Sequence, residues 1–554
     1  MGREISIYLN DALFNAGVLG FYRLYADKKN EFRHSDNQII FDSEILNDFT
    51  DRYLDKLQEQ FRHETVYGQV SNLYNKTLKK GDNYDTDLKE FIEKVKKFEM
   101  ASYKSGYEII KKRGCTYDFL AMIKELPKIK DLEEQQKALD DFAINMKAHK
   151  DIFILKGIAY TKVNAYWESV SFFHRDAVQA EFTESVQKYF TDPAINFIPA
   201  EGKKATMNCC QCGVGLIKKD SGAMSWIKDM GIDIARKTSP FWNYNVDICT
   251  CPVCNLIYSC MPLGFTILRD EGIFINGGKD LYALESLNAE AELKKQVRQE
   301  EAASKNILYG MMSKLVNAYQ QLSDKNMLGN IQVVRRNTNG YTFDVVSAEI
   351  LKRVSRCSKE LDFIAGNWLI MDQLSIDIYN ETTGRILKGR NLYSFIHELL
   401  HYAHSNNKRF SYIYQLIVIQ SLVYTDEKKL GGLKSMSYDK EKEIIKIVKG
   451  ARVEGEKLNL EMSRDTQNSN KIRGLSFKLL NQLKTRDARG YVDTMLRQYM
   501  GLGKAVPKFV SEMLKDENIF LDCGYAFVAG LQGAHRNEST NDTNEKEGGQ
   551  EYDK

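Results

Sequence analysis

The chain has 554 residues, of which 43% are hydrophobic and 11% aromatic, a composition that supports folded domains and excludes a disordered chain. Its 78 lysine and arginine residues are nearly balanced by 75 acidic residues, which leaves a formal net charge of +3. A general positive charge is therefore excluded as the basis of nucleic-acid binding, which would require a local basic patch.

Residues 1–205 predict a mostly helical region. Between residues 43 and 150, apolar residues such as Leu88, Phe91 and Val95 recur at helical spacing within a charged sequence. The first residues lack the apolar segment of a secretory signal, and no apolar run has the length and character of a membrane span. These observations predict a cytoplasmic protein.

Residues 206–280 predict a zinc-binding region with a β-hairpin. Two CxxC pairs occur here, and two residues between thiolates is the spacing of a zinc knuckle. A dense group of cysteines in a chain without a secretion signal is typical of metal binding rather than of disulfides. Two knuckles together close a structural Zn2+ site, and its four predicted ligands are Cys209, Cys212, Cys251 and Cys254.

Other interpretations of these cysteines stay open at this point. Cys210, Cys249 and Cys260 are additional thiols that compete as ligands. Reduced, buried cysteines or an iron–sulfur cluster are the alternatives to zinc, although the paired spacing favours zinc. The residues between the two pairs, 213–250, must form an inserted segment of their own, with a short helix expected near 223–235. A β-hairpin is expected at 264–275.

Residues 281–388 predict a region with a helix and a β-hairpin. A long helix is expected at about 280–325, a hairpin at 331–346 around an Asn-Gly turn, and one more strand at 374–379. The hairpin carries polar side chains that suit a reader of a nucleic-acid groove, although a plain surface turn has the higher prior. These candidates are Arg335, Arg336, Asn337 and Asn339.

Residues 389–535 predict a C-terminal helical bundle, because no strand pattern is sustained there. Residues 536–554 are polar without apolar periodicity and predict a disordered tail. The elements together predict the α+β class: a mostly α-helical multidomain protein with a zinc-knuckle region, small β-hairpins and a C-terminal helical bundle.

The sequence His397-Glu398-Leu399-Leu400-His401 matches the H-E-x-x-H motif of zinc metallopeptidases. In such enzymes the two histidines bind zinc and the glutamate activates water. A third ligand is also needed, and Glu427 is the nearest acidic candidate besides Asp426. The competing interpretation is an amphipathic helix, because the apolar residues around the motif share one face and the histidines the other. The second interpretation is favoured.

A basic run follows in the same helical region. Its commonest explanation is a solvated helix face, and the alternative is a set of phosphate contacts. The candidate nucleic-acid-binding residues are Lys471, Arg473, Lys478, Lys484, Arg486 and Arg489. Tyr491 and Tyr499 are candidates for base stacking, but core packing is the favoured role of both.

Three stretches together resemble the CRISPR-associated CXXC–CXXC proteins, the large subunit of the type I-B surveillance complex (Cascade). The first is the opening at residues 9–21, and the second is the double knuckle followed by Pro262-Leu263-Gly264-Phe265 and by the strand at 273–276. The third is the C-terminal run from residue 470 to residue 531. Residues 30–190 carry no matching motif.

The resemblance implies a DNA-recognition and scaffold subunit rather than an enzyme. Such proteins check the protospacer-adjacent motif (PAM), support the R-loop and recruit the helicase-nuclease. The implied partners are CRISPR RNA, target double-stranded DNA, displaced single-stranded DNA, the Cascade backbone and small subunits, and the helicase-nuclease effector. The helical region at 389–535 resembles the small subunit, and Met436 or Met462 would be the start of a separately made copy.

Overall fold

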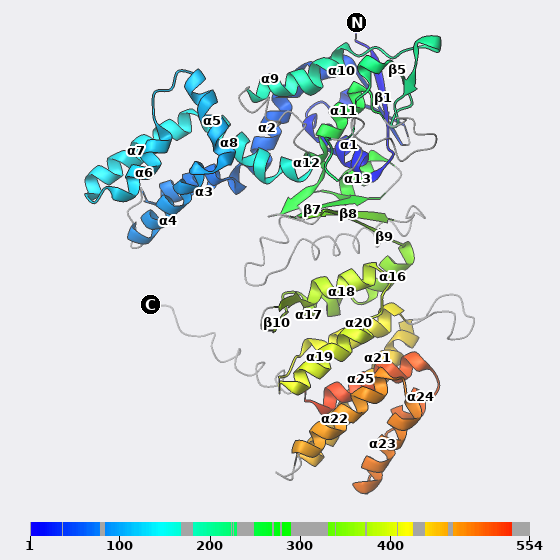
Figure 1. The fold of residues 1–554 in the computed structure, drawn as a ribbon. Helices are drawn as coiled ribbons and strands as arrows, with labels where there is room; N and C mark the ends of the chain where they lie inside the picture. Colours follow the sequence, from blue (N-terminus) through cyan, green and yellow to red (C-terminus); the bar gives the residue numbers. More distant parts are fainter. Residues whose placement is uncertain are drawn as a thin grey trace, which may run out of the picture. The chain divides into compact units, whose positions relative to one another are not determined.

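The computed structural model (Figure 1) describes residues 2–35, 37–77, 84–167, 181–222, 224, 226–229, 249–268, 271–277, 280–289, 331–337, 340–371, 374–406, 408–424, 438–463 and 469–533. Its contacts divide the chain into two compact units. The N-terminal unit consists of Met1–Glu290 and Ile331–Phe343, and the described part of the C-terminal unit begins at Asp344 and ends at Gly533. The boundaries predicted inside these units, after residues 205, 280 and 388, stay predictions. The predicted tail and most of 223–235 lie outside the described residues.

The N-terminal unit begins with a small antiparallel sheet and a buried helix. The strands β1 (Glu4–Tyr8), β2 (Arg33–Ser35) and β3 (Gln38–Asp42) lie in the order β1-β3-β2. Between them, α1 (Ala12–Leu24) starts at Asp11, whose carboxylate accepts hydrogen bonds from the first turn. Arg23 is the one residue of α1 that is not buried, as expected for a helix that is apolar on all sides.

Most of the remaining N-terminal unit is helical. Figure 1 shows α3–α8 gathered on one side of the unit, where they pack on one another. The helices are α2 (Phe49–Phe61), α3 (Val66–Thr77), α4 (Tyr84–Lys96), α5 (Ala101–Lys112), α6 (Phe119–Glu125), α7 (Leu132–Ala148), α8 (Lys150–Thr161), α9 (Phe182–Val186) and α10 (Asp192–Asn196). The predicted helical character of residues 43–150 is confirmed, whereas the sheet at the start of the chain was not predicted.

Helix α1 packs closely on α11 (Pro252–Ser259) and α12 (Met261–Gly264). A Cβ atom added at Gly20 would lie 2.1 Å from the carbonyl oxygen of Cys260, and one added at Gly264 would lie 1.8 Å from that of Ala16. These distances leave room for glycine alone. The opening of the chain is thereby locked to the segment that follows the second knuckle.

Both predicted hairpins are confirmed, and they join into one sheet. The strands β6 (Thr266–Leu268), β7 (Glu271–Asn276), β8 (Ile331–Asn337) and β9 (Gly340–Val346) lie in the order β6-β7-β8-β9. The joint is the antiparallel pair β7–β8, which was not predicted.

The long helix predicted at 280–325 is corrected. Helix α13 (Leu281–Leu287) ends after seven residues. Its end is fixed by Asn288, whose side-chain amide exchanges two hydrogen bonds of 2.8 Å with the backbone N–H and C=O of Ile275 in β7. Asn288 is the C-cap residue of α13, and these side-chain bonds hold it against the strand. Residues 290–330 lie outside the described part of the chain.

The C-terminal unit is a helical bundle, as predicted, and its described residues also include a small hairpin that was not predicted. The predicted strand near 374–379 is β11 (Leu374–Asp377), paired with β10 (Trp368–Met371). The helices are α16 (Ala348–Arg356), α17 (Ser358–Ile364), α18 (Ile378–Leu387), α19 (Tyr393–Ser405), α20 (Tyr412–Tyr424), α21 (Tyr438–Met462), α22 (Ser469–Lys484), α23 (Ala488–Gly501), α24 (Phe509–Met513) and α25 (Glu517–Leu531). Helix α25 contacts α19, α20, α21, α22 and α24 and is therefore the central helix of the bundle.

Helices α21 and α25 cross at two glycines. A Cβ atom added at Gly455 would lie 2.1 Å from the carbonyl oxygen of Phe527, and one added at Gly530 would lie 2.0 Å from that of Arg452. The two backbones therefore approach each other without intervening side chains. This crossing fixes the longest helix of the unit to its core.

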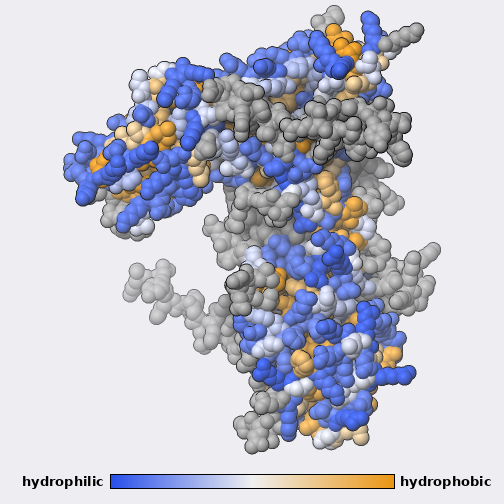
Figure 2. Space-filling view, viewed as in Figure 1, coloured by the Kyte–Doolittle hydropathy of each residue, from blue (hydrophilic) through white to orange (hydrophobic). Residues whose placement is uncertain are grey.

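The surface is mostly hydrophilic on one face (Figure 2), and the class of the protein agrees with the prediction. On the face shown in Figure 2, hydrophilic residues predominate and hydrophobic areas are small. Within the described part of the chain, no helix has both the length and the apolar character that a membrane crossing requires. The α+β class, mostly helical with small antiparallel sheets, is confirmed.

The buried acid Asp522 gives the C-terminal unit a pH-dependent stability. Its side chain is 3% exposed and accepts a hydrogen bond of 2.9 Å from Tyr393. Burial raises the pKa of Asp522 to about 7, above the value of about 3.9 for an unfolded chain. The folded state therefore binds a proton that the unfolded state lacks between these values. The stabilising contribution is complete below about pH 4 and is lost as the pH rises through about 7.

We expect Asp522→Asn to remove this pH dependence. The amide keeps an acceptor for Tyr393 but carries no charge. A pKa raised from about 3.9 to about 7 corresponds to about 4 kcal/mol, so the free energy of unfolding of the variant at pH 8 should exceed that of the wild type by up to that amount. At pH 4 this advantage should vanish. Denaturant unfolding at both pH values measures the difference, and an identical difference at the two values would contradict the assignment.

Candidate metal centre

The first knuckle is a tight turn between two short strands. Strands β4 (Met207–Asn208) and β5 (Gly215–Leu216) pair antiparallel and hold Cys209–Cys212 at their joint. The N–H of Gly213 donates to the carbonyl of Cys209 at 2.9 Å, and Gly213 has a φ of 73°. This left-handed conformation suits glycine, so the residue after the CxxC closes the turn.

The second knuckle is the N-terminus of α11. Cys251 is the N-cap residue, Pro252 follows it in the first turn, and the Cys251 sulfur accepts from the N–H of Cys254 at 3.3 Å. Proline suits the first turn of a helix because its missing N–H would have no intrahelical partner. The positive end of the helix dipole favours a thiolate at this position.

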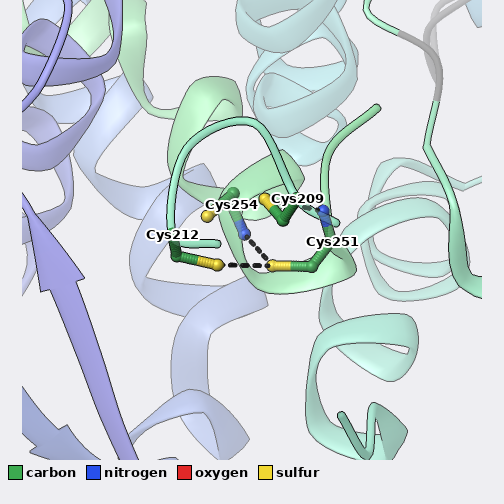
Figure 3. Close-up of side chains that lie close together, drawn as sticks. All are labelled: Cys209, Cys212, Cys251 and Cys254. Atoms are coloured by element: carbon green, nitrogen blue, oxygen red, sulfur yellow. Dashed lines mark hydrogen bonds between the residues drawn. The ribbon is translucent and has the colours of Figure 1, made fainter. Parts of the chain in front are cut away.

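The four predicted ligands meet in one cluster (Figure 3). All four sulfur atoms lie within 4.8 Å of one another, and those of Cys212 and Cys251 are 3.7 Å apart. A tetrahedral site with metal–sulfur distances of about 2.3 Å has sulfur–sulfur distances of about 3.8 Å. The N–H of Cys251 also donates to the Cys209 sulfur at 3.2 Å. The donor set and its spacing therefore fit a closed four-thiolate metal site.

The electrostatics of the cluster require a counter-charge. Hydrogen bonds from the neighbouring thiols, first that of Cys212, hold the pKa of Cys209 far below its usual value. The contact with Cys209 raises the pKa of both Cys251 and Cys254. Four adjacent sulfurs thus do not all lose their protons without compensation, and a bound divalent cation would supply it.

The additional cysteines have other contacts. Cys210 is exposed, with its sulfur 3.9 Å from that of Met224. The thiol of Cys249 lies 3.6 Å from the carbonyl oxygen of Asn208, and the thiol of Cys260 lies 3.6 Å from that of Leu256. None of these three thiols belongs to the cluster of Cys209, Cys212, Cys251 and Cys254.

The centre is also tied to the opening of the chain, a connection that sequence reasoning missed. Asp11 accepts hydrogen bonds from Gln211 at 2.7 Å and from Tyr258 at 2.9 Å. Asn15 donates to Asn276 at 2.9 Å, which links the opening to strand β7. Stretches that are far apart in the sequence therefore form one structural unit around the cysteines. The sequence signal that could have indicated this contact is that the opening, the double knuckle and the strand at 273–276 occur together in the same chain.

These features fit a protein whose N-terminal unit is folded around a four-cysteine site that could hold a structural metal ion. Residues 202–266 match a family described as CRISPR-associated protein (Cas_CXXC_CXXC). The match agrees with the resemblance of the double knuckle to the CRISPR-associated CXXC–CXXC proteins, and it covers this part of the chain. No curated protein and no solved structure matches the chain.

The hairpin candidates have different positions. Arg336 is 3% exposed; its guanidinium donates to the carbonyl of Ala165 at 2.6 Å, pairs with Asp229 at 3.2 Å and lies over the ring of Tyr341. This buried network gives Arg336 a packing role. Arg335 and Asn337 are half-buried, and Asn339 lies outside the described residues.

The basic candidates of the C-terminal unit are exposed. Lys471, Arg473, Lys478 and Lys484 project from α22, while Arg486 and Arg489 flank the start of α23. Arg486 pairs with Glu517 at 2.6 Å, but both side chains are more than half exposed, so the pair is weak. In contrast, Tyr491 and Tyr499 are buried, which confirms core packing for both.

The H-E-x-x-H segment lies on α19 as the amphipathic interpretation predicted. Its apolar residues, such as Leu399 and Leu400, are buried, whereas Glu398 and His401 are exposed. Glu427 lies outside the described residues. Within the described part of the chain, the four cysteines are the group with metal-binding geometry, and no such group includes the histidines. The metallopeptidase hypothesis is not favoured.

Proposed function

We propose that the chain is the large subunit of a type I-B CRISPR RNA-guided surveillance complex. The observation that carries the proposal is the four-cysteine centre within the family match, tied by Asp11 and Asn15 to the opening of the chain. In this role the protein would recognise the protospacer-adjacent motif, support the R-loop and recruit the helicase-nuclease. It would act in the cytoplasm as a scaffold without catalytic residues.

In this proposal the metal is Zn2+, and its role is structural. A closed site of four thiolates leaves no position for water or substrate. The centre instead joins the two knuckles, α1 and β7 into one body. Zinc at this position would stabilise the fold rather than take part in a reaction.

Nucleic-acid contacts are assigned to two places. The exposed basic residues of α22 and α23 would bind phosphates of the displaced single strand. Arg335 and Asn337 on the β8–β9 hairpin remain candidates for contact with the target duplex. Arg336 is not carried into this set, because its guanidinium is already engaged inside the N-terminal unit.

Co-purification with the products of neighbouring genes tests the proposal. We expect the tagged chain to bring down a discrete set of proteins and one small RNA. A short C-terminal product is also expected. Whether this product contains α21 depends on which methionine starts it. This helix occupies Tyr438–Met462 and packs along α25, so a start at Met436 retains it and a start at Met462 removes it. A chain that purifies alone and without RNA would contradict the proposed function.

The basic residues are tested by a fourfold substitution. Replacing Lys471, Arg473, Lys484 and Arg486 with alanine should weaken binding of target DNA. The slope of log affinity against log salt should fall by about 3, because each phosphate contact on a single strand contributes about 0.7. Affinity measured over a salt series gives both quantities.

A charge-matched control lies in the N-terminal unit. Lys89, Lys104, Lys124 and Lys137 are exposed lysines of its helices. Their replacement with alanine changes the net charge equally and should leave the slope close to that of the wild type. Equal effects of the two fourfold variants would contradict the assignment, because the net charge alone would then explain the loss of binding.

A further inference from the structure

The surface shared by α19 and α22 carries a group of aromatic and histidine rings to which the proposed function assigns no role. Two histidines of α19 lie beside one phenylalanine of α22, and a third histidine lies beside the first of them. The ring of Phe477 lies 5.8 Å from that of His401 and 6.4 Å from that of His404, and His401 is 6.4 Å from His397. Phe477 is 44% exposed, so part of its ring is open to a ligand. We call His397, His401, His404 and Phe477 the ring platform.

Two cations border the ring platform. Burial and then the charge of Lys484 lower the pKa of His397, and burial and then the charge of Arg473 lower the pKa of His404. The guanidinium of Arg473 also donates to the carbonyl of Ser405 at the end of α19, at 3.3 Å. Arg473 and Lys484 are thus close enough for their charges to act on the imidazoles.

These charges decide between a metal ion and an anion as the ligand. A divalent cation at His397 and His401 would sit beside Lys484 and Arg473 and would be repelled by both. A phosphate group would be attracted by the same charges and would accept hydrogen bonds from them. Glu398, exposed on the flank of the helix, is the one acidic residue of the motif and opposes an anion.

The exposed ring of Phe477 limits the possible anionic ligands further. A free phosphate gains nothing from Phe477, whereas a nucleobase stacks on phenylalanine and histidine rings. In a duplex the faces of the bases are covered by their neighbours, so an unpaired strand is the form that offers them. We propose that the ring platform binds single-stranded nucleic acid, with a base on Phe477 and phosphates at Arg473 and Lys484. Its setting in the R-loop rests on the proposed function.

The test uses the full chain and fluorescence anisotropy with labelled oligothymidine, oligouridine and a duplex. Phe477→Ala should weaken binding of the single strand about tenfold, in line with the loss of one base–aromatic stack. His401→Gln, which removes a second ring from the exposed surface, should weaken it in the same direction. The duplex should bind more weakly than either single strand, and the tighter of the two single strands identifies DNA or RNA as the ligand.

The chain offers a matched control. Phe363 on α17 is 43% exposed, lies in the same unit and is not part of the ring platform. Phe363→Ala should bind as the wild type does. Equal affinities of the Phe477→Ala and Phe363→Ala variants, or equal binding of duplex and single strand, would overturn the inference.

The Glu398→Gln variant distinguishes nucleic-acid binding by the ring platform from metallopeptidase activity. Removing the negative charge should leave oligonucleotide affinity unchanged or raise it, whereas the glutamate of a metallopeptidase is indispensable. Wild-type protein that binds Ni2+ at His397 and His401, with loss of this binding in His401→Gln, would overturn the choice of an anion. The Phe477→Ala chain should still co-purify with its partners and RNA, so failure of the ring platform is distinguishable from failure of the proposed function.

Discussion

Cys254→Ser is expected to release the metal and to destabilise the N-terminal unit by several kcal/mol. The sulfur of Cys254 is one of four within 4.8 Å of one another and is buried, so serine removes a ligand where water cannot replace it freely. Structural zinc sites contribute about 10–16 kcal/mol in small isolated domains, and part of that free energy should be lost here. Metal content per chain and thermal unfolding measure the two effects.

Cys210→Ser is the matched control for this substitution. It lies in the first knuckle beside the ligand Cys209, but its exposed thiol is not among the four clustered sulfurs. The control should keep its metal and its unfolding temperature. Retention of metal by Cys254→Ser, with unchanged unfolding, would exclude the four-cysteine assignment.

Gly455→Ala should have the second largest effect. The new Cβ would lie 2.1 Å from the carbonyl oxygen of Phe527, so α21 and α25 must separate along their crossing. Because backbone atoms cannot move aside as a side chain does, we expect a loss of about 3 kcal/mol or more in the free energy of unfolding. Chemical denaturation followed by helical circular dichroism measures it.

Gly450→Ala on the same helix separates packing from helix propensity. Nothing lies within 4 Å of a Cβ atom at Gly450. Alanine is the better helix former there by about 1 kcal/mol, so this control should be neutral or slightly stabilising. Equal losses in the two variants would show that the crossing is not the cause.

Local patterns in the sequence predicted the local parts of the fold. The CxxC spacing identified the four cysteines that the structure brings together, because a two-residue spacer is sufficient to form a knuckle. The hairpin 331–346 followed from its Asn-Gly turn, and the amphipathic face of α19 followed from helical periodicity.

The features that were missed depend on residues that are far apart in the sequence. Strand β7 pairs with β8 across residues 277–330, and no local pattern encodes such a register. Arg336 resembled a surface residue of a turn, but Asp229, Tyr341 and the carbonyl of Ala165 enclose its guanidinium. The C-cap residue of α13, Asn288, is likewise held against a strand edge at Ile275. Each of these outcomes is a tertiary contact that overrides a local preference.

The burial of α1 has a consequence for folding during synthesis. Its packing partners α11 and α12 begin at Pro252 and Met261, so the ribosome must add about 240 residues after α1 before they exist. At about 5–20 residues per second, the apolar opening of the chain stays without its final partners for on the order of 10–50 s. During that interval it is exposed to chaperones and to aggregation. Nascent chains stalled before the second knuckle should therefore remain protease-sensitive at their N-termini.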